Sequence, residues 1–95
     1  MRRSAKVDTN QPEIVKALRG AGAFVVITSQ LKNAFDLLVC YNSQVFITEV
    51  KDGNKPPSKR KLTEGEQKCK EGVESVGCVY NVITSVDEAL EMIKL

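Results

Sequence analysis

Histidine is absent from this 95-residue chain, and its three cysteines form no Cys-x-x-Cys pair. Without histidine, no Ser–His–Asp or Cys–His catalytic arrangement is available, and the commonest zinc ligand is missing. We expect Cys40, Cys69 and Cys78 to be small core side chains, not a disulfide framework or a zinc site. A metal site in this chain would need oxygen ligands, which favours Mg²⁺ or Mn²⁺.

Long apolar runs and a strong net charge are also missing. No apolar stretch approaches the roughly 20 residues that span a membrane, and the N-terminal sequence MRRSAKVDTN lacks the apolar stretch of a signal peptide. We therefore expect a cytoplasmic protein with no membrane partner. The net charge of +2 is too small to indicate a nucleic-acid partner by itself. At this length we expect one domain, residues 1–95.

The stretch from Asn33 to Gly53 predicts a β-hairpin. Residues 37–41 and 44–51 are rich in Val, Ile, Phe and Tyr, and Asn42-Ser43 separates them. Such a pair favours a two-residue turn, because asparagine tolerates a positive φ. The hairpin therefore pairs residue 41 with residue 44.

This register brings two acidic side chains together. Asp36 lies directly across from Glu49, with Cβ atoms about 5 Å apart, and strand alternation puts Lys51 on the same face. Opposed like charges destabilise a sheet unless a positive group lies between them, and a divalent cation beside the lysine would supply one. Two simpler explanations remain open: strand ends often carry charge, and Lys51 could form a salt bridge with either acid.

The whole chain predicts helices and strands in the order α-β-β-β-α-β-α. Both faces of the hairpin are apolar, and a sheet buried on both faces needs helices on both sides. We therefore expect an α/β fold of the α+β type, with a mixed four-stranded sheet flanked by helices. The predicted elements are a helix over 12–19, strands over 23–28, 37–41 and 44–51, a helix from Thr63, a strand over 78–83 and a helix from Ser85.

An aspartate, a hairpin and a Glu-x-Lys triplet resemble the core of the PD-(D/E)xK nuclease superfamily, and most closely small phage and bacterial domains of the VRR-NUC and Holliday-junction-resolvase type. The resemblance covers nearly the whole chain, through DTNQPEIVKALRGAGA, FDLLVCY, FITEVKDG, KPPSKRKLTEGEQ and TSVDEALEMI. Phe35 stands where the family usually has proline. The resemblance implies a restriction-endonuclease-like fold and a metal-dependent endonuclease that hydrolyses phosphodiester bonds in DNA.

Four residues are candidates for holding Mg²⁺, or Mn²⁺ as a substitute. Asp36 and Glu49 would supply carboxylates, and Val50 would supply its backbone carbonyl oxygen. The resemblance adds Glu13, because an acid on the first helix often completes the metal shell in that family. Glu13 has a second explanation, since the helix dipole favours a glutamate near a helix start.

Lys51 and Gln67 are the further catalytic candidates. Lys51 would position or deprotonate the attacking water, or stabilise charge in the transition state; a lysine that acts as a base needs a lowered pKa. Gln67 lies in the segment LTEGEQ, near the start of the second predicted helix, and the resemblance implies that a glutamine at such a helix start supports the site.

Two basic runs flank this predicted site and are the candidates for binding phosphate. Basic runs are usually solvated loops, but a phosphate backbone would need positive charge beside the carboxylates. We expect DNA, branched or duplex, as the partner, and a homodimer whose two sites make paired nicks. The alternative is a catalytically inactive nucleic-acid-binding or assembly module of the same fold. The nucleic-acid-binding candidates are Arg2, Arg3, Lys6, Lys55, Lys59, Arg60 and Lys61.

Overall fold

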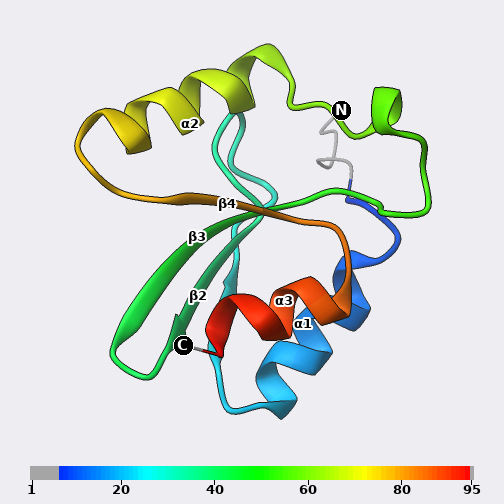
Figure 1. Ribbon diagram of the computed structural model, residues 1–95, viewed down its shortest axis with the longest axis vertical. Helices are drawn as coiled ribbons and strands as arrows, with labels where there is room; N and C mark the ends of the chain where they lie inside the picture. The colour runs from blue at the N-terminus through cyan, green and yellow to red at the C-terminus, as the bar shows by residue number, and fades with distance from the viewer. Residues whose placement is uncertain (1–6, 95) are drawn as a thin grey trace.

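The computed structural model describes residues 7–94, and their elements follow the predicted order (Figure 1). A 3₁₀ turn precedes the second helix. The elements are α1 (Gln11–Gly20), β1 (Phe24–Ile27), β2 (Leu37–Tyr41), β3 (Gln44–Val50), η1 (Pro57–Lys59), α2 (Glu64–Ser75), β4 (Tyr80–Ile83) and α3 (Val86–Ile93). No helix among the described residues is long and apolar enough to cross a membrane.

The four strands form one mixed sheet in the order β1-β2-β3-β4. The β1–β2 and β2–β3 pairs are antiparallel and the β3–β4 pair is parallel. The predicted hairpin register is confirmed, because Tyr41 pairs with Gln44. Asn42 (φ 50°) and Ser43 (φ 65°) both have positive φ, as a type I′ turn requires. This register runs to the pair Leu37 and Thr48, one step before the two candidate metal ligands.

Helices α1 and α3 lie together on one face of the sheet, and α2 lies on the other (Figure 1). The core fills the space between the sheet and the α1–α3 pair. Each strand contributes alternate residues to it, as expected for a sheet with one well-covered face. Its completely buried apolar side chains are Ile14, Leu18, Leu37, Val39, Val50 and Ala89.

The outer face of the sheet is only partly covered, contrary to the expectation of burial on both faces. Phe24 is 66% exposed and Val45 is 64% exposed, although both side chains are apolar. The reason lies in α2, which contains no buried residue. Its sequence EGEQKCKEGVES is too polar to cover a sheet face, and Cys69 and Val73 are only half-buried. An apolar strip near the hairpin tip therefore remains open to solvent.

Asn10 fastens α1 to the edge of the sheet where β3 and β4 end. It occupies the N-cap position of α1, but its side chain makes no capping hydrogen bond. Instead, its amide donates to the carbonyl oxygens of Lys51 (3.1 Å) and Thr84 (3.1 Å). The Lys51 amide in turn donates to the Ile83 carbonyl (2.9 Å). The backbone that carries Lys51 is thus held from both sides.

Candidate active site

Asp36, Glu49 and Lys51 meet on the outer face of the sheet, beside the first turn of α2. Asp36 immediately precedes β2, Glu49 is the penultimate residue of β3, and Lys51 follows it. Asp36 and Glu49 line a cavity of ≈ 240 Å³ together with Thr63, Glu66 and residues of the segment 29–35. The structure therefore brings the predicted triad to one place.

The Asp36 carboxyl group is held by the neighbouring strand. Its Oδ2 accepts a hydrogen bond from the Val50 amide (2.9 Å), and its own amide donates to the Thr48 carbonyl (3.0 Å). The N–H and C=O groups of one strand residue point to the same side. The Val50 carbonyl is therefore directed toward the side on which Asp36 lies. Burial raises the pKa of Asp36, although the Val50 hydrogen bond acts in the opposite direction.

Glu49 is an unusual carboxyl group, because only 2% of its surface is exposed. Its carboxyl group adjoins those of Asp36 and Glu66, and the Tyr80 hydroxyl lies 3.3 Å from its Oε1. Burial, followed by the negative charges of Asp36 and Glu66, raises the pKa of Glu49 to about 9. At neutral pH this cluster therefore retains a proton among its carboxyl groups. A divalent cation could replace that proton.

Lys51 places a positive charge beside the carboxyl groups of the site. Its Nζ lies 2.8 Å from Glu66 Oε1 and 3.6 Å from Glu49 Oε2. Burial acts to lower the pKa of Lys51, but the hydrogen bond and charge of Glu66, together with the charge of Glu49, outweigh it, so the pKa is raised. Of the predicted roles, this environment favours positioning and charge stabilisation over proton abstraction.

Glu66 is a site residue that sequence reasoning missed. As the third residue of α2 it closes a capping box with Thr63: the Thr63 amide donates to Glu66 Oε1 (2.9 Å), and the Glu66 amide donates to Thr63 Oγ1 (3.2 Å). The same Oε1 accepts from Lys51, and these hydrogen bonds lower the pKa of Glu66 despite its burial. The sequence contained one signal for it, since the capping box directs this side chain back toward the preceding loop.

Comparison with known proteins supports the architecture. No protein-family model matches the sequence, and no curated protein matches it. A solved structure described as a VRR_NUC domain is similar, with a TM-score of 0.65 and 21% sequence identity, over 92% of this chain and 97% of the other. The protein has a VRR-NUC-like fold. At this identity the likeness concerns the fold, and the predicted restriction-endonuclease-like architecture is confirmed.

Two candidate site residues lie elsewhere on the VRR-NUC-like fold. Glu13 is exposed on α1 and lines a separate cavity of ≈ 320 Å³ with Asp52 and Thr84. Gln67 is exposed on α2, where its amide donates to Glu71 Oε2 (3.3 Å). The sequence pattern placed both residues correctly on their helices. It could not show which face of each helix points toward the site.

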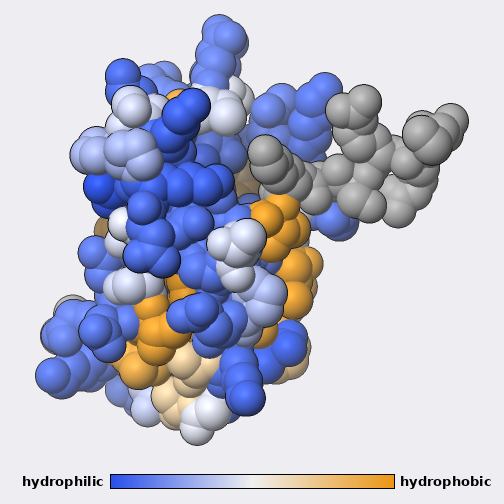
Figure 2. Space-filling view, turned by 90° about the vertical axis from the view of Figure 1, so that its right-hand side faces the viewer, coloured by the Kyte–Doolittle hydropathy of each residue, from blue (hydrophilic) through white to orange (hydrophobic). Residues whose placement is uncertain are grey.

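The basic candidates fall into two groups. Arg2, Arg3 and Lys6 lie outside the described residues 7–94. The others belong to the loop between β3 and α2, which begins beside Lys51 and ends at Thr63, so both its ends lie at the site. Figure 2 views the side of the molecule that carries this loop, and most of that surface is hydrophilic. In this loop Lys55, Lys59 and Lys61 are exposed and Arg60 is half-buried.

The oxygen atoms of this site suit a hard cation such as Mg²⁺, which would keep water or phosphate as some of its ligands. Within residues 7–94, no group of three or more His, Cys, Asp or Glu side chains is arranged to hold a metal ion. Mg²⁺ in phosphoryl-transfer enzymes is commonly held by one or two carboxylates, with water and substrate phosphate completing the shell. Asp36, Glu49 and the Val50 carbonyl fit that pattern.

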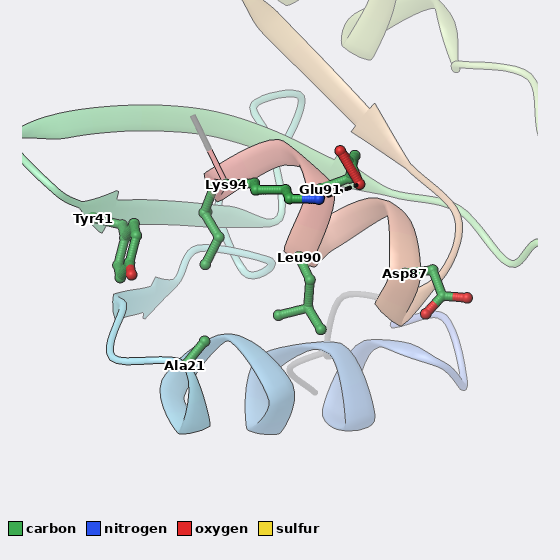
Figure 3. A pocket seen from close by; sticks show the side chains of 7 residues that line it. Ala21, Tyr41, Asp87, Leu90, Glu91 and Lys94 are labelled. Atoms are coloured by element: carbon green, nitrogen blue, oxygen red, sulfur yellow. Dashed lines mark ion pairs between the residues drawn. The ribbon is translucent and has the colours of Figure 1, made fainter.

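A larger cavity of ≈ 510 Å³ lies between α1 and α3, on the far side of the sheet (Figure 3). Its apolar wall includes Leu90, which points toward α1. Its charged residues Glu91 and Lys94 pair with each other at 3.9 Å. Its two carboxyl groups, those of Asp87 and Glu91, are exposed, whereas Glu49 of the smaller cavity is buried, so size alone does not identify the site.

Proposed function

We propose that this protein is a metal-dependent endonuclease that hydrolyses phosphodiester bonds in DNA. The observation that carries the proposal is the meeting of the Asp36 and Glu49 carboxyl groups beside Lys51 in a VRR-NUC-like fold. Asp36, Glu49 and the Val50 carbonyl would hold Mg²⁺, or Mn²⁺ in its place. When bound, such a cation neutralises phosphate charge and lowers the pKa of a water molecule.

The chain's own residues then have distinct tasks. The Val50 amide fixes the orientation of the Asp36 carboxyl group through its Oδ2 atom. Lys51 places a positive charge beside Glu49, where it would stabilise charge that develops on the phosphate. Glu66 holds Lys51 in that position through the 2.8 Å contact.

The direct test is incubation of labelled linear, forked and four-way DNA with the protein in Mg²⁺, Mn²⁺ or EDTA. We expect cleavage in either metal and none in EDTA, with branched DNA cut faster than linear duplex. Absence of cleavage in both metals would overturn the proposal. Binding without cleavage would favour the alternative, a nucleic-acid-binding module of the same fold.

The loop between β3 and α2 should contribute to DNA affinity through charge. Replacing the exposed Lys59 and Lys61 by glutamine should reduce the slope of log Kd against log salt by about 2, because each lost phosphate contact removes roughly one counterion. Fluorescence anisotropy at several salt concentrations measures this slope. A matched control neutralises Lys16, on α1, and Lys94, directly after α3, at the other face of the sheet. An unchanged slope in the loop variant would place the DNA elsewhere.

We propose further that two copies associate through the open strip of the outer face. The register places Phe24 beside Cys40, and Cys40 beside Val45, so these side chains form one row across three strands. The row is apolar, and two of its three residues are largely exposed. Covering it with a second copy would remove apolar surface from water and supply two sites for paired nicks.

Val45→Lys should therefore convert a dimer into a monomer. A buried charge in the middle of an apolar interface is costly, so the mass measured by light scattering should fall from about twice to about once the 10.5 kDa of the chain. Gly20→Lys is the control, because a Cβ added at that position meets nothing within 4 Å. A wild-type mass of one chain across micromolar concentrations would contradict the dimer.

A further inference from the structure

Tyr80 connects the two halves of the carboxylate site. It begins β4, pairs with Ile47 in the parallel ladder, and is only 4% exposed. Its hydroxyl lies 3.3 Å from Glu49 Oε1 and 3.1 Å from the carbonyl oxygen of Ala34. Glu49 is one candidate ligand, and Ala34 lies two residues before the other. One hydroxyl group therefore contacts both β3, which supplies Glu49, and the turn before β2, which supplies Asp36.

The turn that contains Ala34 is well anchored at its other positions. The Thr28 amide donates to the Asp36 carbonyl (2.7 Å), and Thr28 Oγ1 donates to the Phe35 carbonyl (2.7 Å). On its outer side, Asn33 lies so close to Gly65 of α2 that a Cβ on Gly65 would collide with it. Tyr80 supplies the contact that joins this anchored turn to Glu49.

We propose that Tyr80 is a positioning residue of the metal site, whose hydroxyl fixes the Glu49 carboxyl group relative to the turn that delivers Asp36. This inference rests on the proposed function of that site. Mg²⁺ tolerates little departure from its ligand distances and angles. Residues that orient metal ligands typically change metal affinity or activity by about 10-fold to 100-fold when they are removed.

A purely structural role makes a different prediction. If Tyr80 served only to fill space on the outer face of the sheet, phenylalanine would replace it without consequence for the metal, because the ring would be retained. Tyr80→Phe removes one oxygen atom and leaves the ring, so it separates the two explanations. The other tyrosine, Tyr41, ends β2 and lines the cavity on the opposite side of the sheet (Figure 3). Tyr41→Phe is therefore the matched control.

The test is titration with Mn²⁺ alone, followed by electron paramagnetic resonance, at a temperature where circular dichroism shows each variant to be folded. We expect Tyr80→Phe to weaken Mn²⁺ binding by about 10-fold or more, and Tyr41→Phe to leave it unchanged. In cleavage assays, Tyr80→Phe should need more Mn²⁺ for half-maximal rate, while its rate at saturating Mn²⁺ stays within a few-fold of wild type.

The two proposals fail in different ways. Wild-type Mn²⁺ affinity in Tyr80→Phe would overturn the positioning role and leave the nuclease proposal standing. A second result is that the wild type binds Mn²⁺ but cuts no DNA, and that Tyr80→Phe binds Mn²⁺ more weakly. This result would support the positioning role and overturn the nuclease proposal. A wild-type protein that binds no Mn²⁺ would overturn both. An equal loss of affinity in Tyr41→Phe would show a general effect on the fold and so contradict the specific role of Tyr80.

Discussion

Asp36→Asn should lower DNA cleavage by a factor of about 10² or more, because a metal-dependent step loses several kcal/mol when the cation is lost. Asparagine keeps the size of the side chain and an oxygen that accepts from the Val50 amide, so the turn before β2 should be retained. It removes the negative charge that a cation needs. DNA affinity should persist or rise, since a negative charge that faces phosphate has been removed.

The measurements are single-turnover cleavage, fluorescence anisotropy for binding, and Mn²⁺ titration on the same protein. Asp87→Asn, on α3 at the far side of the sheet, is the control and should leave all three unchanged. Lys51→Ala should also abolish cutting, but Mn²⁺ should still bind at the two carboxylates. If neither Asp36→Asn nor Lys51→Ala alters cleavage, the chemistry takes place elsewhere.

Glu49→Gln should stabilise the protein in the absence of metal, most strongly at alkaline pH. The pKa of Glu49 is raised from 4.5 to about 9 in the folded protein, so its contribution to stability is complete below about pH 4.5 and is lost as the pH rises toward 9. The raised pKa of Asp36 acts in the same direction. The pKa of Lys51 is raised from 10.5, so it affects stability only at higher pH than this range. The pKa of Glu66 is lowered from 4.5, so it affects stability only at lower pH.

Glutamine keeps a neutral hydrogen-bonding group at this buried position at every pH. At pH 8 in EDTA, we expect the variant to gain at least about 1 kcal/mol in free energy of unfolding, or roughly 4–8 °C in Tm for a domain of this size. Between pH 5 and pH 9, the Tm of the wild type should fall as the pH rises, and the Tm of the variant should change less. Adding Mn²⁺ should raise the Tm of the wild type only. Glu13→Gln is the exposed control, and parallel melting curves for wild type and Glu49→Gln would contradict this account.

Local patterns predicted the parts of the site that lie close together in the chain. The Asn42-Ser43 turn set the hairpin register, and the register placed Asp36 near Glu49 and put Lys51 on the same face. These are short-range relations, in which turn chemistry and the two-residue repeat of a strand determine the outcome. The order of all the helices and strands was predicted for the same reason.

Contacts that depend on the return of distant segments could not be predicted in this way. Tyr80 reaches Glu49 only because β4 pairs with β3 in parallel, and Glu66 reaches Lys51 only because α2 begins above the end of β3. Glu13 illustrates the converse, since a plausible position on a helix does not fix the side of the sheet at which the helix packs. The open outer face was missed because apolar alternation shows which residues share a face, but not what covers that face.

Helix α2 is packed only loosely on the sheet, and this affects how DNA could reach the cavity of ≈ 240 Å³ beside it. The helix buries none of its side chains fully, and its first turn is held mainly by polar contacts and by the close approach of Gly65 to Asn33. Local unfolding free energies are lowest where few apolar groups are buried. The amides of α2 should therefore exchange with deuterium faster than those of β2 and β3. We therefore expect α2 to move aside when a sugar–phosphate chain enters the cavity, while the strands that carry the site remain in place.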